Sequence, residues 1–230
     1  MAYDERTVAP GIEVWRSTGR TGPYRILPDG CMDLILADGR LLVAGPDTSA
    51  RVHRRAEPRT VTGVRLHVGR GPALLGLPAD ELRDQTVRLE DVWGDRRARV
   101  LTEQVSERPA PALTTWACAA RTVDPFGERV RALLDRGTPV GDVADAVGYS
   151  ARQLHRRLLP VFGYGPQHLR RVLRLMRAVA AADTGSRWSD VAQRAGFTDQ
   201  AHLVREVRAL TGVTPSELRR ERVRSFQDAA

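Results

Sequence analysis

One helical pattern occurs twice in the last hundred or so residues of this 230-residue chain, and it limits the fold more than any other feature. The run DVADAVGY at 142–149 recurs as DVAQRAGF at 190–197. The run GYGPQHLRR at 163–171 recurs as GVTPSELRR at 212–220, with Gly, Pro, Leu and both Arg residues in the same places. A duplicated motif can contact two successive sites on a repetitive ligand, and DNA is such a ligand.

Each copy predicts a helix, a tight turn and a second helix, at about 138–163 and 187–212. Gly148 should end the first helix, because glycine adopts the left-handed conformation without strain. Ser150 can cap the next helix. Apolar residues at helical spacing mark the buried faces of the two second helices: Leu154, Leu158, Val161 and Phe162 in the first copy, and Leu203, Val207 and Leu210 in the second.

The opposite faces of these second helices carry a row of arginines, which is typical of a helix-turn-helix whose second helix enters the major groove. The first face has Arg152 and Arg156, and the second has Arg205 and Arg208. Between the copies, residues 166–182 form an amphipathic run without internal Gly or Pro. About 17 residues at ~1.5 Å each give a strut of roughly 25 Å, which can hold two recognition helices about one DNA turn apart. A capping box at 214–217 should start a closing helix.

Residues 124–222 resemble the DNA-binding domain of the AraC/XylS family of bacterial transcription regulators. The resemblance rests on the run VADAVGYS at 143–150, on the long linker helix, and on the spaced Gly, Phe, Leu, Arg, Thr and Pro residues of 196–215. It implies that bases are read by six residues, which are Arg152, His155 and Arg156 in the first motif and Gln200, His202 and Arg205 in the second.

Two positions depart from the family pattern. Leu159-Pro160 replaces a polar pair, and Pro160 removes the hydrogen bond to the Arg156 carbonyl, so we expect a kink there. Ala201 stands where many relatives have a longer side chain. We expect Arg170 and Arg171 to contact phosphates or lie on the surface.

Charge is distributed unevenly along the chain, whose net charge is +8. Residues 1–110 hold 17 Arg and 16 Asp or Glu, whereas residues 111–230 hold 19 Arg and 12 Asp or Glu. The basic excess therefore accompanies the repeated helices, as phosphate binding requires. The chain has no Lys, so its Arg richness by itself reflects genomic bias, and a solvated surface stays the alternative explanation.

The chain shows no 18-residue apolar run and no secretory signal, so the sequence predicts a cytoplasmic, nucleoid-associated protein without a membrane partner. Its two cysteines have no paired spacing, which argues against a disulfide framework or a zinc site. No metal or other cofactor is expected.

The first ~105 residues predict an antiparallel β barrel or sandwich-like domain. Five apolar or alternating runs, separated by turn signals, are expected to be strands: 12–15, 24–27, 32–36, 41–44 and 61–68. The Asp38-Gly39 pair indicates a tight hairpin. A short helix at 78–82 and a longer one near 95–107 should close the domain, with a linker at 108–111 and a docking helix at 113–121. The expected fold class is α+β multidomain, with domains at 1–107 and 124–225 joined by 108–123.

The N-terminal runs, including LPDGCMDLI at 27–35, VAGP at 43–46 and LEDVWG at 89–94, resemble the β sensor domain of one AraC-type subgroup whose ligands are largely unassigned. The resemblance implies a sensor or dimerisation role. Cys31 could be a redox-sensing thiol or a small buried side chain. His53 and His67 could bind a metal, but the His-x-His pair of a cupin-like site is missing. Trp15, Tyr24 and Trp93 could line a ligand cavity or pack in the core.

These observations predict a sequence-specific bacterial transcription regulator that binds double-stranded DNA, and not an enzyme. The roles of activator and repressor both stay open. Arginine can offer guanine two hydrogen bonds, and Gln200 could pair with adenine. A small-molecule effector or homodimerisation through the N-terminal domain would shift the DNA-competent population. The family implies RNA polymerase as a partner. Two alternatives stay open: an enzyme of the β domain tethered to nucleic acid, and an architectural DNA binder without an effector.

Overall fold

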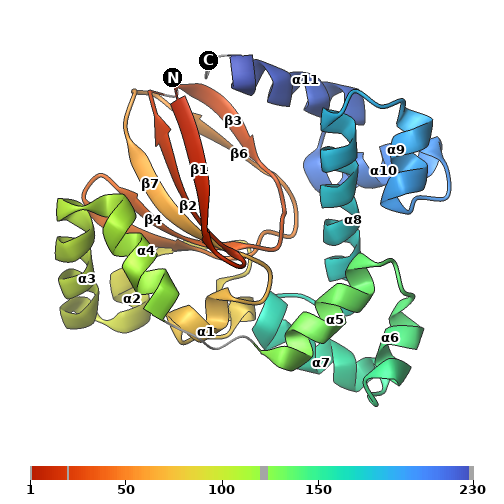
Figure 1. Ribbon diagram of the computed structural model, residues 1–230, viewed down its shortest axis with the longest axis horizontal. Coiled ribbons are helices and arrows are strands. Elements are labelled where there is room, and N and C mark those ends of the chain that lie inside the picture. Colours follow the sequence, from red (N-terminus) through yellow and green to blue (C-terminus); the bar gives the residue numbers. More distant parts are fainter. Residues whose placement is uncertain (1, 20, 120–123, 228–230) are drawn as a thin grey trace.

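The computed structural model describes residues 2–19, 21–119 and 124–227. An antiparallel β domain precedes an all-helical domain, which confirms the expected fold class (Figure 1). The strands are β1 (Ala2–Ala9), β2 (Ile12–Thr18), β3 (Gly22–Ile26), β4 (Met32–Ala37), β5 (Arg40–Ala44), β6 (Arg51–Arg55), β7 (Val61–Leu66) and β8 (Thr86–Arg88).

Within the described residues, the strands form two sheets and no closed barrel. Six of them follow the order β1-β2-β7-β4-β5-β8, and β3 pairs with β6 in a separate ribbon. Asp38 and Gly39, with φ of 51° and 72°, make the predicted hairpin between β4 and β5. All five expected strands are present, whereas β1, β6 and β8 were not predicted. Polar and charged residues dominate β1 and β6, so neither gives an apolar alternation.

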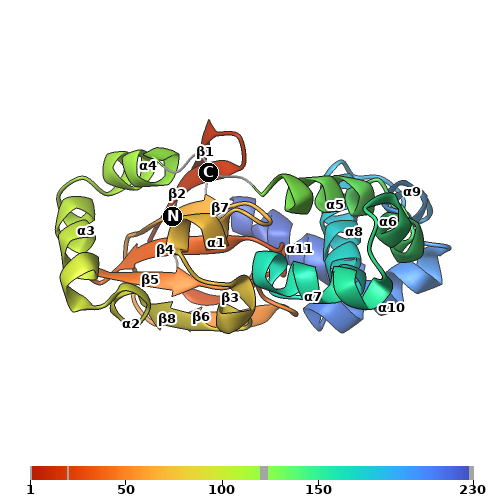
Figure 2. The same ribbon diagram turned by 90° about the horizontal axis from the view of Figure 1, so that it is seen from below.

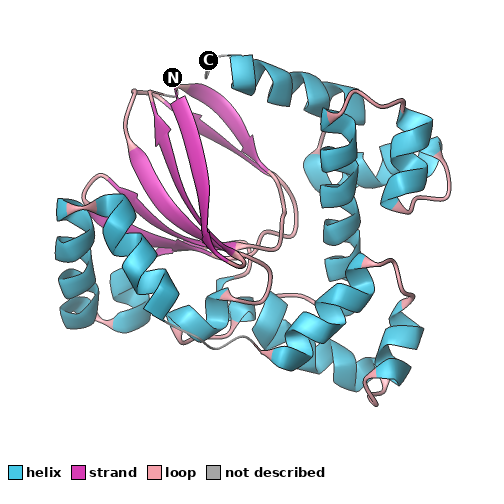
Figure 3. Ribbon diagram, viewed as in Figure 1, coloured by secondary structure: helices cyan, strands magenta, loops and turns pink. Residues whose placement is uncertain are grey.

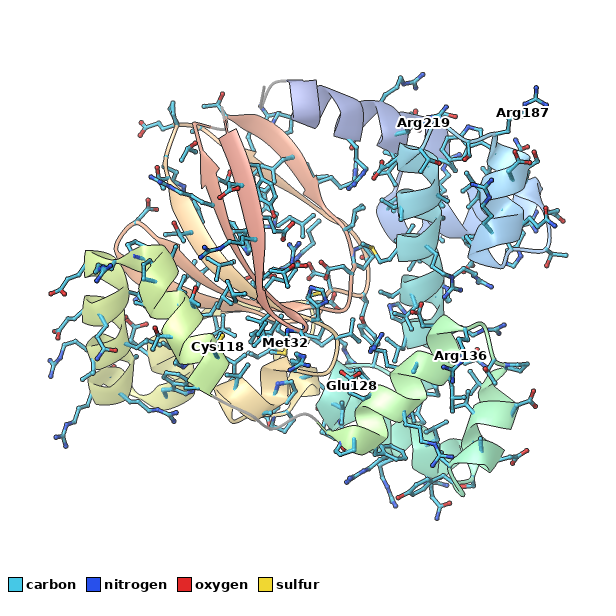
Figure 4. All side chains as sticks on the ribbon, in the orientation of Figure 1. Met32, Cys118, Glu128, Arg136, Arg187 and Arg219 are labelled. Atoms are coloured by element: carbon cyan, nitrogen blue, oxygen red, sulfur yellow. The ribbon has the colours of Figure 1, made fainter. Side chains whose placement is uncertain are left out.

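Short helices cover one face of the six-stranded sheet (Figure 3). Met32 of β4, labelled in Figure 4, packs against Gly71 there. The predicted helix at 95–107 is confirmed, and the short one expected at 78–82 is a single 3-10 turn. These elements are α1 (Gly71–Leu75), η1 (Ala79–Leu82), α2 (Leu89–Trp93), α3 (Asp95–Glu107) and α4 (Pro109–Ala119).

Helix α4 differs from the sequence-based expectation. Its first turn takes up most of the segment 108–111 that was expected to be a linker, because proline is tolerated at the start of a helix as well as in a loop. Leu113 and Ala117 of this helix are fully buried in the core beneath the sheet. Helix α4 thus packs as part of the N-terminal domain. The end of the expected docking helix, 120–121, lies outside the described residues.

The helical domain contains two separate hydrophobic cores, one around each copy of the repeat. Helix α8 runs between them and matches the expected linker helix (Figure 1). Among the residues described, no helix is both long and apolar enough to cross a lipid bilayer. The helices are α5 (Pro125–Asp135), α6 (Val140–Ala146), α7 (Ala151–Phe162), α8 (Pro166–Asp183), α9 (Trp188–Ala195), α10 (Gln200–Thr211) and α11 (Pro215–Gln227).

Candidate nucleic-acid interface

The first motif consists of α6, a turn at Gly148 and α7. Gly148 has the predicted left-handed conformation, with φ of 73°. Ser150 caps α7 as predicted: its Oγ accepts a hydrogen bond from the Gln153 N–H, and the Gln153 side chain accepts one from the Ser150 N–H at 2.9 Å. Leu154, Leu158 and Phe162 of α7 are buried, so the opposite face of this helix is free to meet a ligand. The helix continues through Pro160 to Phe162.

Arg152 and Arg156 lie on the exposed face of α7, and neither side chain has a hydrogen-bond partner among the residues that the structure describes. His155 is also exposed, but its imidazole lies against the backbone of Gly165, where a Cβ atom would collide with the ring. The two arginines can therefore reach outward, while His155 packs along the turn into α8.

The second motif repeats this construction with α9, a left-handed Gly196 and α10. Asp199 caps α10, because its carboxylate accepts a hydrogen bond from the His202 N–H at 2.6 Å. Leu203 and Val207 are buried, as predicted from the repeat. Asp199 was not predicted as a cap, although an Asp directly before an apolar periodic run is a recognised cap signal.

The three residues predicted to read bases in the second motif differ in whether their side chains already have hydrogen-bond partners. Gln200 and Arg205 are exposed, with no hydrogen-bond partner among the described residues. The His202 Nδ1 lies 3.2 Å from the Thr198 Oγ1 and accepts from the Thr198 N–H at 3.3 Å, and its ring meets Phe197 edge-on. Only the Nε2 of His202 is left for another partner. Ala201 is exposed beside these residues.

Helix α8 holds the two motifs at its opposite ends, and α7 and α10 both lie on the lower side of the helical domain in Figure 2. Its 18 residues span roughly 27 Å at ~1.5 Å per residue, comparable with one turn of DNA. Arg177 of α8 connects the end of α5 to the end of α9 in the second motif. Its guanidinium contacts the Asp135 carboxylate at 2.9 Å and donates to the Ala195 carbonyl at 3.2 Å.

The sequence placed Arg170 and Arg171 as phosphate-contacting or surface residues, and the structure shows both partly exposed with hydrogen bonds inside the protein. Arg170 donates to the Gly137 carbonyl at 3.3 Å, and the Arg171 Nε donates to Glu206 at 2.9 Å. Both are partly buried and bonded within the protein, because the α8 face that carries them packs against the motifs. Glu206, on α10, was not singled out in the sequence because its partners lie 32 and 35 residues away.

The N-terminal domain holds other candidates from the sequence. Burial raises the pKa of the Cys31 thiol well above its ordinary value, and the neighbouring Asp29 adds to the shift. The His67 Nε2 lies 3.0 Å from Glu13, and the ring of His53 stacks on Tyr24. Across the described residues, no group of three or more His, Cys, Asp or Glu could hold a metal ion.

Two tryptophans lie in different settings. The Trp15 Nε1 donates to the Asp33 carboxylate at 2.7 Å, on the sheet face turned away from the helices. Burial raises the pKa of Asp33 to about 6, although Arg65 acts in the opposite direction. Trp93 instead lines an open groove of about 620 Å³ between α3 and α4, together with Trp116 and Arg97, whose guanidinium lies 3.9 Å from the Trp93 ring.

Two family models and several solved structures match this chain. Residues 143–221 match the model of a helix-turn-helix domain, and residues 12–88 match that of a domain of unknown function. ToxT from Vibrio cholerae, in its P21 crystal form, is 12% identical, with a TM-score of 0.50 over 96% of this chain and 99% of that one. ToxT from Vibrio cholerae O395 gives 12% identity and a TM-score of 0.49 over 93% and 98%. No curated protein matches the chain significantly.

The paired motifs, their exposed arginines and the fold define a DNA-binding transcription regulator of the helix-turn-helix class. The helix-turn-helix match over residues 143–221 agrees with the resemblance of that part of the sequence to AraC-type regulators.

Proposed function

We propose that the protein binds a bipartite DNA site, with α7 and α10 in two successive major-groove segments. The arrangement of α7 and α10 at the two ends of α8 is the observation that carries this proposal. Arg152, His155 and Arg156 would contact bases in one half of the site, and Gln200, His202 and Arg205 in the other. Of these, the four arginine and glutamine side chains that lack a partner among the described residues are the strongest candidates for base contacts.

The base contacts follow from the chemistry of the side chains. Arg156 and Arg205 can each offer two hydrogen bonds to guanine, and Gln200 can pair with adenine. His202 would contribute through its Nε2, because its Nδ1 is used in the turn. Capping of both helices orients their N-terminal turns, and the free N–H groups of such turns bind phosphate well.

Selection of random DNA duplexes by the full-length chain tests the proposal. The expected product has two specified half-sites whose centres lie about 10 to 11 base pairs apart. Recovery of a single specified segment, or of no consensus, would contradict two-motif recognition.

We further propose that the N-terminal domain regulates this binding through a small-molecule effector or a second subunit, and that RNA polymerase is the downstream partner at target promoters in the bacterial nucleoid. The support for an effector is the polar sheet face around Asp33 and Arg65. Their charges are largely buried, and ionisable groups with shifted pKa values often mark ligand sites. Sedimentation of the full-length chain with and without operator DNA would separate dimerisation from an effector alone.

A further inference from the structure

The N-terminal domain contacts the two motifs at the same structural position, which is the carboxyl end of each recognition helix. Gly163 and Gly212 are equivalent in the repeat, and they end α7 and α10 in the left-handed conformation. Arg83 donates to the Gly163 carbonyl at 3.2 Å, and Arg25 donates to the Thr211 carbonyl at 2.7 Å. The last carbonyls of a helix lack partners within it and carry partial negative charge, so a cation stabilises them.

The junction with the first motif is mainly apolar. Val68, which follows β7, belongs to the hydrophobic core of the first motif. Tyr164, in the turn after α7, is buried against the N-terminal domain, close to Gly30 and Val68. Gly69 likewise faces the ring of Phe162. The first motif is therefore attached to the β domain by several apolar contacts, and this attachment does not depend on a single hydrogen bond.

The junction with the second motif is mainly polar. Of the described N-terminal residues, Leu27 alone packs against the core of the second motif. Hydrogen bonds and an ion pair add to this contact. The Ala50 N–H donates to the Leu210 carbonyl at 2.7 Å, and Arg25 binds both the Thr211 carbonyl and the Glu221 carboxylate, the latter through its Nε at 3.0 Å. The Arg25 side chain is only 16% exposed, so it is held between β3, α10 and α11.

The two motifs depend on few direct links to each other. Their cores are separate clusters, joined by the continuous helix α8 and by the contacts of Arg177. Helix α8 fixes the distance between the motifs, and the contacts of Arg177 and of the β domain add to what fixes their relative angle. In Figure 1 the β domain, α7, α8 and α10 follow one another around a ring. The hydrogen bond from Arg25 to the Thr211 carbonyl connects α10 back to the β domain.

We propose that Arg25 is a positioning residue for DNA recognition. By holding the carboxyl end of α10 on the β domain, it sets where the second recognition helix stands relative to the first. It thereby sets the number of base pairs accepted between the two half-sites. This inference rests on the proposed bipartite recognition.

The test measures binding of the full-length chain to duplexes made from its own selected site. One or two base pairs are inserted or removed between the half-sites. The wild-type chain should bind the selected spacing at least about tenfold more tightly than its neighbours, because a mispositioned recognition helix loses its base contacts. Arg25→Ala should bring all spacings to within about threefold of one another. Arg25→Lys keeps the charge but loses the two-pronged geometry, so its profile should be intermediate.

Matched controls separate positioning from stability. Arg54→Ala removes an exposed arginine on β6, the strand that pairs with β3. The Arg54 side chain has no partner among the described residues, so this variant should leave the spacing profile unchanged. Circular dichroism establishes whether each variant is folded. If Arg25→Ala does not fold, the spacing profile of Arg25→Lys tests the inference instead.

The outcomes are distinct. A variant at Arg25 that binds more weakly at every spacing, with an unchanged profile, would overturn the inference. Tighter binding of Arg25→Ala at the selected spacing would also overturn it, because Arg25 would then hold α10 away from DNA. A wild-type chain that selects only one half-site would overturn the bipartite function itself, and with it the role of Arg25.

Discussion

Glu206, on the second recognition helix, accepts a hydrogen bond from the Arg171 Nε of α8 at 2.9 Å. Arg174 approaches the same carboxylate oxygen at 3.2 Å and also lies over the ring of Phe197. Burial alone would raise the pKa of Glu206, but the two arginines outweigh it and leave the pKa below its ordinary value. An acidic residue on a DNA-facing helix would repel phosphate, and here its charge is turned inward and neutralised.

Replacing Glu206 with Gln should therefore lower the stability of the second motif by on the order of 1 kcal/mol at neutral pH. Because the folded pKa is lowered, the wild-type contribution is complete above about pH 4.5 and is lost as the pH falls through the folded value. The difference between wild type and Glu206→Gln should thus shrink on acidification. Urea unfolding at pH 7 and pH 3.5 measures it.

Glu103→Gln is the matched control, because Glu103 and its partner Arg99 are both largely exposed and 4.0 Å apart. That variant should match the wild type at both pH values. A Glu206→Gln variant as stable as the wild type at pH 7 would show that the ion pair does not hold α10.

Arg156→Ala and Arg205→Ala should each relax base preference in a different half of the site. Loss of a two-bond contact to guanine costs ~1–3 kcal/mol for the matched base. We expect Arg156→Ala to relax base preference more than Arg205→Ala. Arg152 lies on the same helix face as Arg156, whereas the residue beside Arg205 is Ala201, whose side chain cannot hydrogen-bond to a base. Binding selections on both variants decide this, with Arg99→Ala on the distant α3 as control. If Arg205→Ala blurred more positions than Arg156→Ala, the ranking of the motifs would be wrong.

Salt should weaken DNA binding steeply. The half of the chain from residue 111 carries a net charge of +7, which exposed arginines on both motifs display. With about six phosphates neutralised, affinity should fall at least ~10³-fold between 50 and 200 mM salt. Fluorescence anisotropy with a labelled duplex measures the slope for the full-length chain. Affinity that is insensitive to salt would exclude phosphate contacts on this scale.

The N-terminal domain should fold alone as residues 1–119 but be weakened as residues 1–107. The shorter fragment lacks α4, whose Leu113 is fully buried, and burial of one leucine contributes ~1.5–3 kcal/mol. Thermal unfolding of both fragments by circular dichroism should show a clearly lower midpoint for the shorter one. Equal midpoints would mean that α4 adds nothing to this core. Neither fragment should bind DNA, because both lack the two motifs.

Cys31 should be a poor nucleophile. Burial raises the pKa of its thiol, and Asp29 adds to the shift, so little thiolate forms at neutral pH. Cys118, which is exposed on α4, provides an internal comparison. Brief alkylation at pH 8 followed by mass spectrometry should label Cys118 first. Preferential labelling of Cys31 would revive its role as a redox sensor.

The sequence by itself determined the local parts of this protein. The repeat, the left-handed Gly148, the Ser150 cap and the helix α8 all follow from neighbouring residues, because helical periodicity, capping and glycine conformation act over a few positions. The hairpin at Asp38-Gly39 is local in the same sense. The capping box at Thr214 and Glu217, with both hydrogen bonds present, began α11 where the sequence predicted it.

Tertiary structure decided everything that joins distant segments. The strand β6 is Arg-rich and forms only because β3 pairs with it, and the prolines that suggested a linker instead begin α4 beneath the sheet. The turn from α7 to α8 fixes His155. Arg170 and Arg171, which a helical wheel of α8 places on the surface, bond instead to Gly137 and Glu206. Arg25 meets Thr211 across 186 residues. Such contacts depend on how whole helices and strands pack against one another. The local periodicity of the sequence cannot predict them, because the partners are far apart along the chain.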